Sequence, residues 1–196
     1  MDLYTRRRVV GQERLDELTG PVVFVANHNS HMDTPVILRA LPGRWRRRTA
    51  VAAATDYFYD KLRKALAVSL AFGTVPLDRN SGAGVGPGQT GHLDRLIGDG
   101  GSLLFFPEGT RSRDGRLHRF KKGGFKLAMQ ARVPIIPVTI VGSRQVLPPD
   151  EIIFRPGPIV MYLDAPIPTA GLGDDDLEPL MQTVYDAMAK HFKMQN

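Results

Sequence analysis

PVVFVANHNSHMD, residues 21–33, contains an apolar run that stops abruptly at a polar cluster. The apolar residues 22–26 predict a short strand that is buried on both faces, as a covered parallel sheet requires. Asn27 and His28 follow at the carboxyl end of this strand. Ligands bind at that end of the strands in open α/β sheets, so we expect His28 to face a crevice.

The five-residue step from His28 to Asp33 allows two interpretations. Along one regular helix this step would turn the side chains about 140° apart, so they meet only if His28 lies in the turn and Asp33 in the first helical turn. A carboxylate bonded to one imidazole nitrogen would then make His28 a general base. Alternatively, Ser30 and Asp33 form a capping box, which on this pair alone explains most of the pattern. His31 is a competing imidazole.

Composition narrows the class of protein. The 196 residues fit a single globular domain spanning 1–196, with 42% hydrophobic and 23% charged residues. No cysteine is present, which excludes disulfides, thiolate zinc sites and cysteine nucleophiles. The net charge of +6 favours an anionic partner such as nucleic acid, an anionic membrane surface or a phosphorylated substrate.

Membrane contact is expected to be peripheral. No uninterrupted apolar run approaches the roughly 18 residues of a membrane span, and the amino terminus lacks the apolar core of a signal peptide. We therefore expect a cytoplasmic protein that associates with the cytoplasmic face of a membrane.

Strands and helices alternate along the chain, which predicts a three-layer α/β fold with a mainly parallel central sheet flanked by helices. Pro137 lacks a backbone donor and predicts an edge strand or a bulge at its position. The last helix has the clearest 3.6-residue period and is expected to cover the sheet. The predicted strands are 4–10 (an edge strand), 49–54, 73–79, 102–106 and 133–142, the helices are 35–41, 56–72, 120–132 and 174–193, and a hairpin is expected at 152–163.

Two basic segments could lie on a membrane. The sequence RWRRR at residues 44–48 is by default a solvated loop, but a tryptophan among arginines also suits an anionic lipid surface. The helix at 56–72 is either an ordinary amphipathic core helix or an interfacial one. Residues 80–91 hold five glycines and predict a flexible loop, for which a lid is one interpretation.

A second polar turn, FPEGTRS at residues 106–112, again follows a buried strand. Glu108 can brace this turn, while Arg111 and Arg113 can grip a phosphate through bidentate hydrogen bonds. Taken alone, such a turn is more often structural, with Arg111 paired to Glu108. If the strand at 73–79 is parallel to the first, Arg79 emerges on the same rim as His28.

Four blocks in this order resemble the glycerolipid acyltransferase superfamily, which includes lysophosphatidic acid and glycerol-3-phosphate acyltransferases. They are NHNSHMD at 27–33, the segment from Gly73 to Arg79, FPEGTRS at 106–112 and VPIIPV at 133–138. The resemblance covers about residues 7–165. It implies a fold like that of glycerol-3-phosphate acyltransferase.

The resemblance also implies a reaction: transfer of a fatty acyl group from a coenzyme A or carrier-protein thioester to a glycerol hydroxyl, with no acyl-enzyme, metal or other cofactor. His28 would deprotonate the hydroxyl and Asp33 would orient His28. The acceptor would be a glycerophosphate or lysophospholipid, above all 1-acyl-sn-glycerol-3-phosphate, which would give phosphatidic acid. The acceptor site would be built by Arg79, Glu108, Gly109, Thr110 and Arg111, with Arg113 in support.

Two other classes of function remain. A degenerate, non-catalytic lipid-binding member would be expected to have lost His28, Asp33 or Arg111, and all three are present. A nucleic-acid-binding domain is motivated only by the positive charge, and the sequence holds no recognition motif for one. We therefore expect an O-acyltransferase that binds no nucleic acid.

Overall fold

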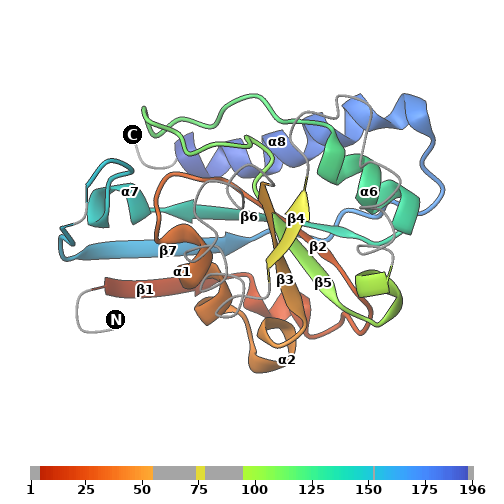
Figure 1. The fold of residues 1–196 in the computed structure, drawn as a ribbon, viewed down its shortest axis with the longest axis horizontal. Helices are drawn as coiled ribbons and strands as arrows, with labels where there is room; N and C mark the ends of the chain where they lie inside the picture. The colour runs from red at the N-terminus through yellow and green to blue at the C-terminus, as the bar shows by residue number, and fades with distance from the viewer. Residues whose placement is uncertain (1–4, 55–73, 78–94, 152, 194–196) are drawn as a thin grey trace.

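The computed structural model describes residues 5–54, 74–77, 95–151 and 153–193 (Figure 1). The expected helix at 56–72 and the expected loop at 80–91 lie outside these residues. The elements in chain order are β1 (Thr5–Val10), η1 (Gln12–Leu15), β2 (Val23–Ala26), α1 (Asp33–Ala40), α2 (Gly43–Arg46), β3 (Thr49–Ala54), β4 (Thr74–Leu77), β5 (Ser102–Phe105), α6 (Gly123–Ala131), β6 (Ile135–Val141), α7 (Ser143–Val146), β7 (Gly157–Leu163), η2 (Asp174–Asp176) and α8 (Leu177–Lys193).

The described strands form one sheet in the order β1-β7-β6-β2-β5-β3-β4. Every neighbouring pair is parallel except β6 and β7, so the prediction of a mainly parallel sheet is confirmed. The central strands β2, β5 and β6 are buried along their whole length, because helices cover both faces. β1 lies at the edge, as predicted.

Two apolar cores separate the sheet from its helices and make the three layers. One core joins the sheet to α1, α2 and α7, and contains Phe24, Ile37 and Trp45. The other joins it to α6 and α8, and contains Phe125 and Val184. α8 runs along the sheet in Figure 1, and the prediction that the last helix covers the sheet is confirmed.

The direction of the strands sets where polar side chains collect. β2, β5 and β6 end on one edge of the sheet, after Ala26, Phe105 and Val141, and we refer to it as the carboxyl edge. β7 is antiparallel to β6, so β7 and its parallel neighbour β1 both begin at this edge. The segment that joins α7 to β7 therefore lies at the carboxyl edge as well.

Pro137 corrects half of one sequence prediction, because its strand is not an edge. It lies in β6, between β2 and β7. The predicted irregularity is present, since Val138 pairs with Leu163 but Ile135 pairs with Ile167, which leaves one extra residue on the partner segment. β7 ends at Leu163, and the N–H of Asp164 donates to the carbonyl oxygen of Pro137 (2.9 Å) at the last step of the pairing. The missing N–H of the proline thus falls where the antiparallel ladder stops, which limits its cost to one bond.

The expected hairpin at 152–163 is also wrong. Only Gly157–Leu163 forms a strand, residues 153–156 form none, and β7 pairs with β6 and β1 instead. The turn signal of RPGP was real, but a local pattern does not identify the distant strand with which a segment pairs.

Trp45 corrects the expectation of a membrane-facing tryptophan in RWRRR. Its side chain is fully buried, with its ring edge-on to Phe24 at 5.9 Å between centroids. The guanidinium of Arg48 lies over the same ring at 4.0 Å from its centroid. The residues of α2 precede β3 and lie at the opposite edge of the sheet from the carboxyl edge. No helix in the described part of the chain is long and apolar enough to span a membrane.

Candidate active site

His28 and Asp33 meet at the carboxyl edge. His28 lies in the turn after β2 and Asp33 is the first residue of α1, which is the arrangement that their spacing requires. His28 Nδ1 lies 3.0 Å from Asp33 Oδ2. The Asp33 side chain is fully buried and that of His28 is 22% exposed, so the pair has one side in the protein and one toward solvent.

The Asp33 carboxylate fixes the tautomer of His28. Its Oδ2 also accepts the backbone N–H groups of Asn29 (2.6 Å) and Ser30 (2.7 Å). Since this oxygen already accepts two N–H groups, it is also the acceptor toward His28, so Nδ1 of His28 carries the proton and donates it. The lone pair on Nε2 of His28 is then available to take a proton, and no described residue donates a hydrogen bond to it.

The capping interpretation of the same residues is also correct in part. The bond from Ser30 N–H to Asp33 is one half of a capping box, and the N–H of Asp33 donates to the Ser30 carbonyl oxygen (3.3 Å). The Ser30 hydroxyl does not complete the box, because its oxygen accepts the N–H of Met32 (3.1 Å) and not that of Asp33, while its hydrogen is donated to the carbonyl oxygen of Leu147 (2.6 Å). One carboxylate thus holds the turn and orients the imidazole.

Phe106 supports the ring of His28, a contact that no sequence pattern predicts. The two rings stack with centroids 4.1 Å apart and planes inclined by 21°. Phe106 is the first residue after β5, which pairs with β2, so the contact comes from adjacent strand ends. The stack and the Asp33 bond together restrict the imidazole to one orientation.

Glu108 connects the FPEGTRS turn to His28. Its Oε1 accepts the backbone N–H of His28 (3.0 Å), and its Oε2 accepts that of His118 (3.1 Å). The N–H of Ser112 in turn donates to the His28 carbonyl oxygen (2.7 Å). Burial raises the pKa of Glu108, although the two backbone N–H bonds oppose that shift. In the structure Glu108 is a brace for His28, and its carboxylate is occupied by the protein itself.

Arg111 lies beside the second histidine and not on Glu108. Its Nη1 contacts the ring of His31, and no described carboxylate pairs with it. His31 Nε2 lies 3.1 Å from the carbonyl oxygen of Pro149, to which it must donate. Burial and the Arg111 charge lower the pKa of His31, so the guanidinium faces a neutral ring and its charge is not offset there.

Of the other predicted residues of the acceptor site, three lie in the FPEGTRS turn or directly after it, and one lies outside the described residues. Thr110 and Arg113 are exposed in the same turn, and Gly109 has a φ of 71° that favours glycine. A Cβ at Gly109 would also displace the end of the Lys121 side chain. β4 is parallel to β3, as the expectation for Arg79 requires, but Arg79 itself lies outside the described residues.

Asn27 was predicted only as a polar neighbour of His28, but in the structure its side chain joins the end of β2 to β6. Its side-chain Nδ2 donates to the carbonyl oxygen of Ile140 (2.9 Å), and its Oδ1 accepts the N–H of Ile140 (2.7 Å). These two bonds extend the β2–β6 pairing beyond the end of β2. They fix the point at which the chain turns into His28.

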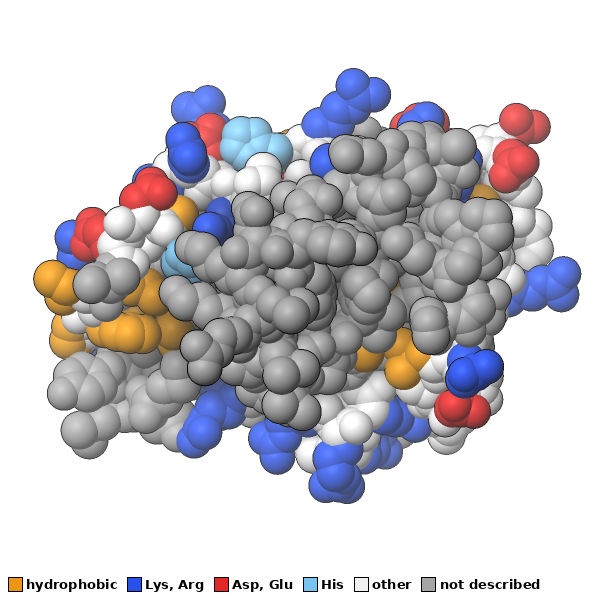
Figure 2. Space-filling model, viewed as in Figure 1, with side chains coloured by type: hydrophobic (Ala, Val, Ile, Leu, Met, Phe, Trp, Pro, Cys, Tyr) orange, Lys and Arg blue, Asp and Glu red, His pale blue; other side chains and the backbone are white. Residues whose placement is uncertain are grey.

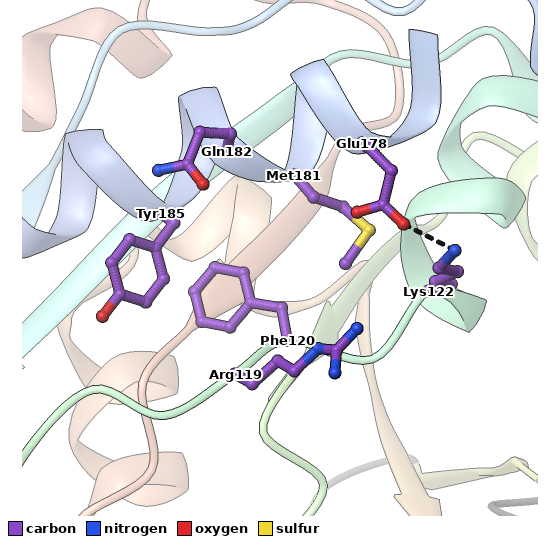
Figure 3. Close-up of a pocket in the computed structure, with 7 residues that line it drawn as sticks. All are labelled: Arg119, Phe120, Lys122, Glu178, Met181, Gln182 and Tyr185. Atoms are coloured by element: carbon purple, nitrogen blue, oxygen red, sulfur yellow. Dashed lines mark ion pairs between the residues drawn. The ribbon is translucent and has the colours of Figure 1, made fainter. Parts of the chain in front are cut away.

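A separate cavity of about 340 Å³ lies on the other face of the sheet (Figure 3). Its apolar lining residues belong to the core under α6 and α8, whereas Phe106 packs on the core under α1. Lys122 and Glu178 form an ion pair across its rim. The lining residues are Arg119, Phe120, Lys122, Glu178, Met181, Gln182 and Tyr185, so the cavity does not include the His28–Asp33 pair.

Known proteins resemble this chain in sequence. A chloroplastic 1-acyl-sn-glycerol-3-phosphate acyltransferase of Brassica napus is 32% identical over 81% of this chain and 44% of its own length. The human 1-acyl-sn-glycerol-3-phosphate acyltransferase alpha is 31% identical over 88% of this chain and 59% of its own length. The chain thus spans about half the length of these curated relatives.

A solved structure gives the same fold. The 1-acyl-sn-glycerophosphate acyltransferase PlsC of Thermotoga maritima matches with a TM-score of 0.78 and 24% identity, over 98% of this chain and 73% of that one. The family model described as Acyltransferase matches residues 6–141. The chain therefore belongs to the acyltransferase family.

Proposed function

We propose that this chain transfers a fatty acyl group from an acyl thioester to a hydroxyl of a glycerophosphate acceptor, with 1-acyl-sn-glycerol-3-phosphate as the acceptor and phosphatidic acid as the product. The observation that carries the proposal is the His28–Asp33 pair at 3.0 Å, with Nδ1 of His28 committed to a buried carboxylate and Nε2 available. The names of the relatives support the acceptor.

His28 acts as the general base in this proposal. Its Nε2 removes the proton from the acceptor hydroxyl as the oxygen attacks the thioester carbonyl carbon. The tetrahedral intermediate collapses, the C–S bond breaks, and the imidazolium returns the proton to the departing thiolate. Asp33 stabilises the positive charge of the imidazolium between these steps. The chain has no cysteine that could form a thioester with the acyl group.

Arg111 binds the acceptor phosphate in this proposal, with Arg113 and Arg79 in support. The guanidinium lies against His31, three residues after His28, and its charge is not paired with a described carboxylate. A phosphate held there would place the glycerol hydroxyl near His28, and binding energy would be converted into orientation. Glu108, Gly109 and Thr110 shape the turn that carries Arg111.

The donor and the cellular location are also proposals. The donor is coenzyme A or an acyl carrier protein, as a co-substrate, and no other cofactor takes part. The net charge of +6 and an amphiphilic acceptor support peripheral association with the cytoplasmic face of an anionic membrane.

Mass spectrometry of the products tests the proposal. Purified protein is offered acyl-coenzyme A or acyl carrier protein with glycerol 3-phosphate, 1-acyl-sn-glycerol-3-phosphate or a zwitterionic lysolipid. Phosphatidic acid should be the main product, and the His28→Ala variant should not form it. Preference for a lysolipid without a terminal phosphate would show that the acceptor is wrong.

A further inference from the structure

Two large hydrophobic side chains are exposed in the part of the chain that the structure describes. Ile153 is 70% exposed and Phe154 is 49% exposed. Both lie between α7 and β7, and Figure 2 shows hydrophobic side chains gathered at the end of the molecule where Figure 1 places this segment. Adjacent large apolar side chains that are exposed to solvent indicate a surface that contacts another apolar phase.

This segment is attached to the candidate active site. Its first residue, Leu147, accepts the hydroxyl hydrogen of Ser30, and Pro149 accepts a hydrogen bond from His31. Ser30 and His31 belong to the same turn as His28. The exposed pair thus follows, by four residues, a contact with the turn that carries the candidate base.

Basic residues lie on the strand that pairs with the one after the exposed pair. Arg6, Arg7 and Arg8 are exposed on the edge strand β1. β1 and β7 begin together at the carboxyl edge, and Arg6 is paired in register with Pro158, four residues after Phe154. Within the segment itself the charge of Glu151 is offset by Arg155, at 2.6 Å. The three positive charges of β1 therefore outnumber the one negative charge of Asp150.

We propose that Ile153 and Phe154 insert into the surface of an anionic bilayer, with Arg6, Arg7 and Arg8 on its headgroups. We call these five residues the docking surface. The commitment to a lipid surface follows from charge: an apolar tip flanked by arginines matches a hydrocarbon boundary covered by anionic headgroups. The inference rests on the proposed function in one respect, namely that the acceptor is a membrane lipid which this contact would bring to the carboxyl edge.

RWRRR provides a matched control, because its arginines have a similar charge but a different position. Arg46 and Arg47 are exposed at the opposite edge of the sheet. If the docking surface faces the bilayer, they face away from it. Their replacement by glutamine removes positive charge without touching the docking surface.

Vesicle co-sedimentation without substrates tests the inference. The full chain and the variants Ile153→Ser/Phe154→Ser, Arg6→Gln/Arg8→Gln and Arg46→Gln/Arg47→Gln are mixed with vesicles of equal parts phosphatidylcholine and phosphatidylglycerol, or of phosphatidylcholine alone. The apolar double variant should bind the anionic vesicles about tenfold or more weakly. Each arginine removed from β1 should weaken binding about fivefold at low salt, and the control should bind as the wild type does.

An activity measurement separates this inference from the proposed function. With a short-chain, monomeric lysophosphatidic acid the apolar variant should keep wild-type turnover, whereas with acceptor embedded in anionic vesicles its rate should fall with the loss of binding.

If the variants differ in vesicle binding as expected but the chain has no acyltransferase activity, the docking surface is retained and the proposed function is refuted. Equal vesicle binding by the apolar variant and the wild type, with unchanged thermal unfolding, would overturn the docking surface. So would a larger loss in the Arg46/Arg47 control, or self-association through Ile153 and Phe154 without vesicle binding.

Discussion

At the scale of single residues, the account depends on how the imidazole of His28 is held. The ring has a donor bond to Asp33 on one side and a stacked phenyl ring of Phe106 on the other. His28→Ala should lower kcat by about 10²- to 10⁴-fold without loss of folding, because a general base contributes that much. Steady-state rates and thermal unfolding check this. His31→Ala should be much milder, and the reverse order would identify the wrong imidazole.

Arg111→Lys tests the recognition of phosphate. Lysine keeps the positive charge but loses the planar, two-pronged donor geometry of arginine. We expect the KM for 1-acyl-sn-glycerol-3-phosphate to rise about tenfold, or kcat/KM to fall as much, while the KM of the acyl donor stays the same. Comparison with an acceptor that lacks the phosphate is the control. An equal penalty for both acceptors would mean that Arg111 only holds the turn.

Glu108→Gln tests the brace between the two turns. A glutamine offers one acceptor where the carboxylate offers two, so either the N–H of His28 or that of His118 would face an amide NH₂ group. An unsatisfied buried donor costs about 1–3 kcal/mol of unfolding free energy, and kcat should fall because His28 shifts. The matched control is Glu178→Gln, an exposed carboxylate paired with Lys122, where little change is expected. Chemical denaturation and kcat are the measurements.

The raised pKa of Glu108 predicts that the unfolding free energies of the wild type and of Glu108→Gln depend differently on pH. Between its ordinary value of 4.5 and the higher value in the folded state, the folded protein binds more protons than the unfolded chain. The contribution of Glu108 to the unfolding free energy is therefore fully present below pH 4.5 and is lost as the pH rises through the folded-state pKa. Denaturation curves across this range should show that the wild type loses more stability than Glu108→Gln as the pH rises. Parallel curves would contradict it.

At the scale of elements, the junction between β2 and β6 depends on Asn27. Its side chain satisfies both backbone groups of Ile140, so Asn27→Ala should cost about 1–3 kcal/mol for each group left buried and unpaired. Thr139→Val is a suitable control, because the Thr139 hydroxyl is buried without a partner and its removal should leave the protein as stable or more so. Equal unfolding free energies for the wild type and Asn27→Ala would refute the bridging role.

The elements also show what a sequence can predict. Buried runs that end in polar residues identified β2 and β5 and their shared rim, because apolar pattern and strand direction are local properties. The antiparallel pairing of β7 was missed, since the partner of a strand is chosen by distant residues. The burial of Trp45 was missed for the same reason: its neighbours in sequence are arginines, and only the fold brings Phe24 to its ring.

The candidate site divides in the same way. The contact between His28 and Asp33 follows from their spacing and from the turn between them, so it could be predicted. The bond from the N–H of His28 to Glu108 and the stack of His28 on Phe106 join residues about 80 positions apart. Such contacts depend on the β2–β5 pairing, which short motifs do not specify.

At the scale of the whole molecule, function and binding are assigned to one edge of the sheet. The His28–Asp33 pair, the FPEGTRS turn, the segment before β7 and the start of β1 all lie at the carboxyl edge. Each element end brings a different property there: a base, a cation, an apolar tip and a row of arginines. A protein organised in this way could take an amphiphilic acceptor directly from a lipid surface.

The most direct test of acyl transfer follows two products in one reaction. Purified protein is incubated with acyl-coenzyme A and 1-acyl-sn-glycerol-3-phosphate, and free thiol and phosphatidic acid are measured at the same times. We expect both to appear in equal amounts, only when the acceptor is present, and the His28→Ala protein to form neither at a comparable rate. Release of thiol without formation of phosphatidic acid, or no reaction by a correctly folded protein, would contradict it.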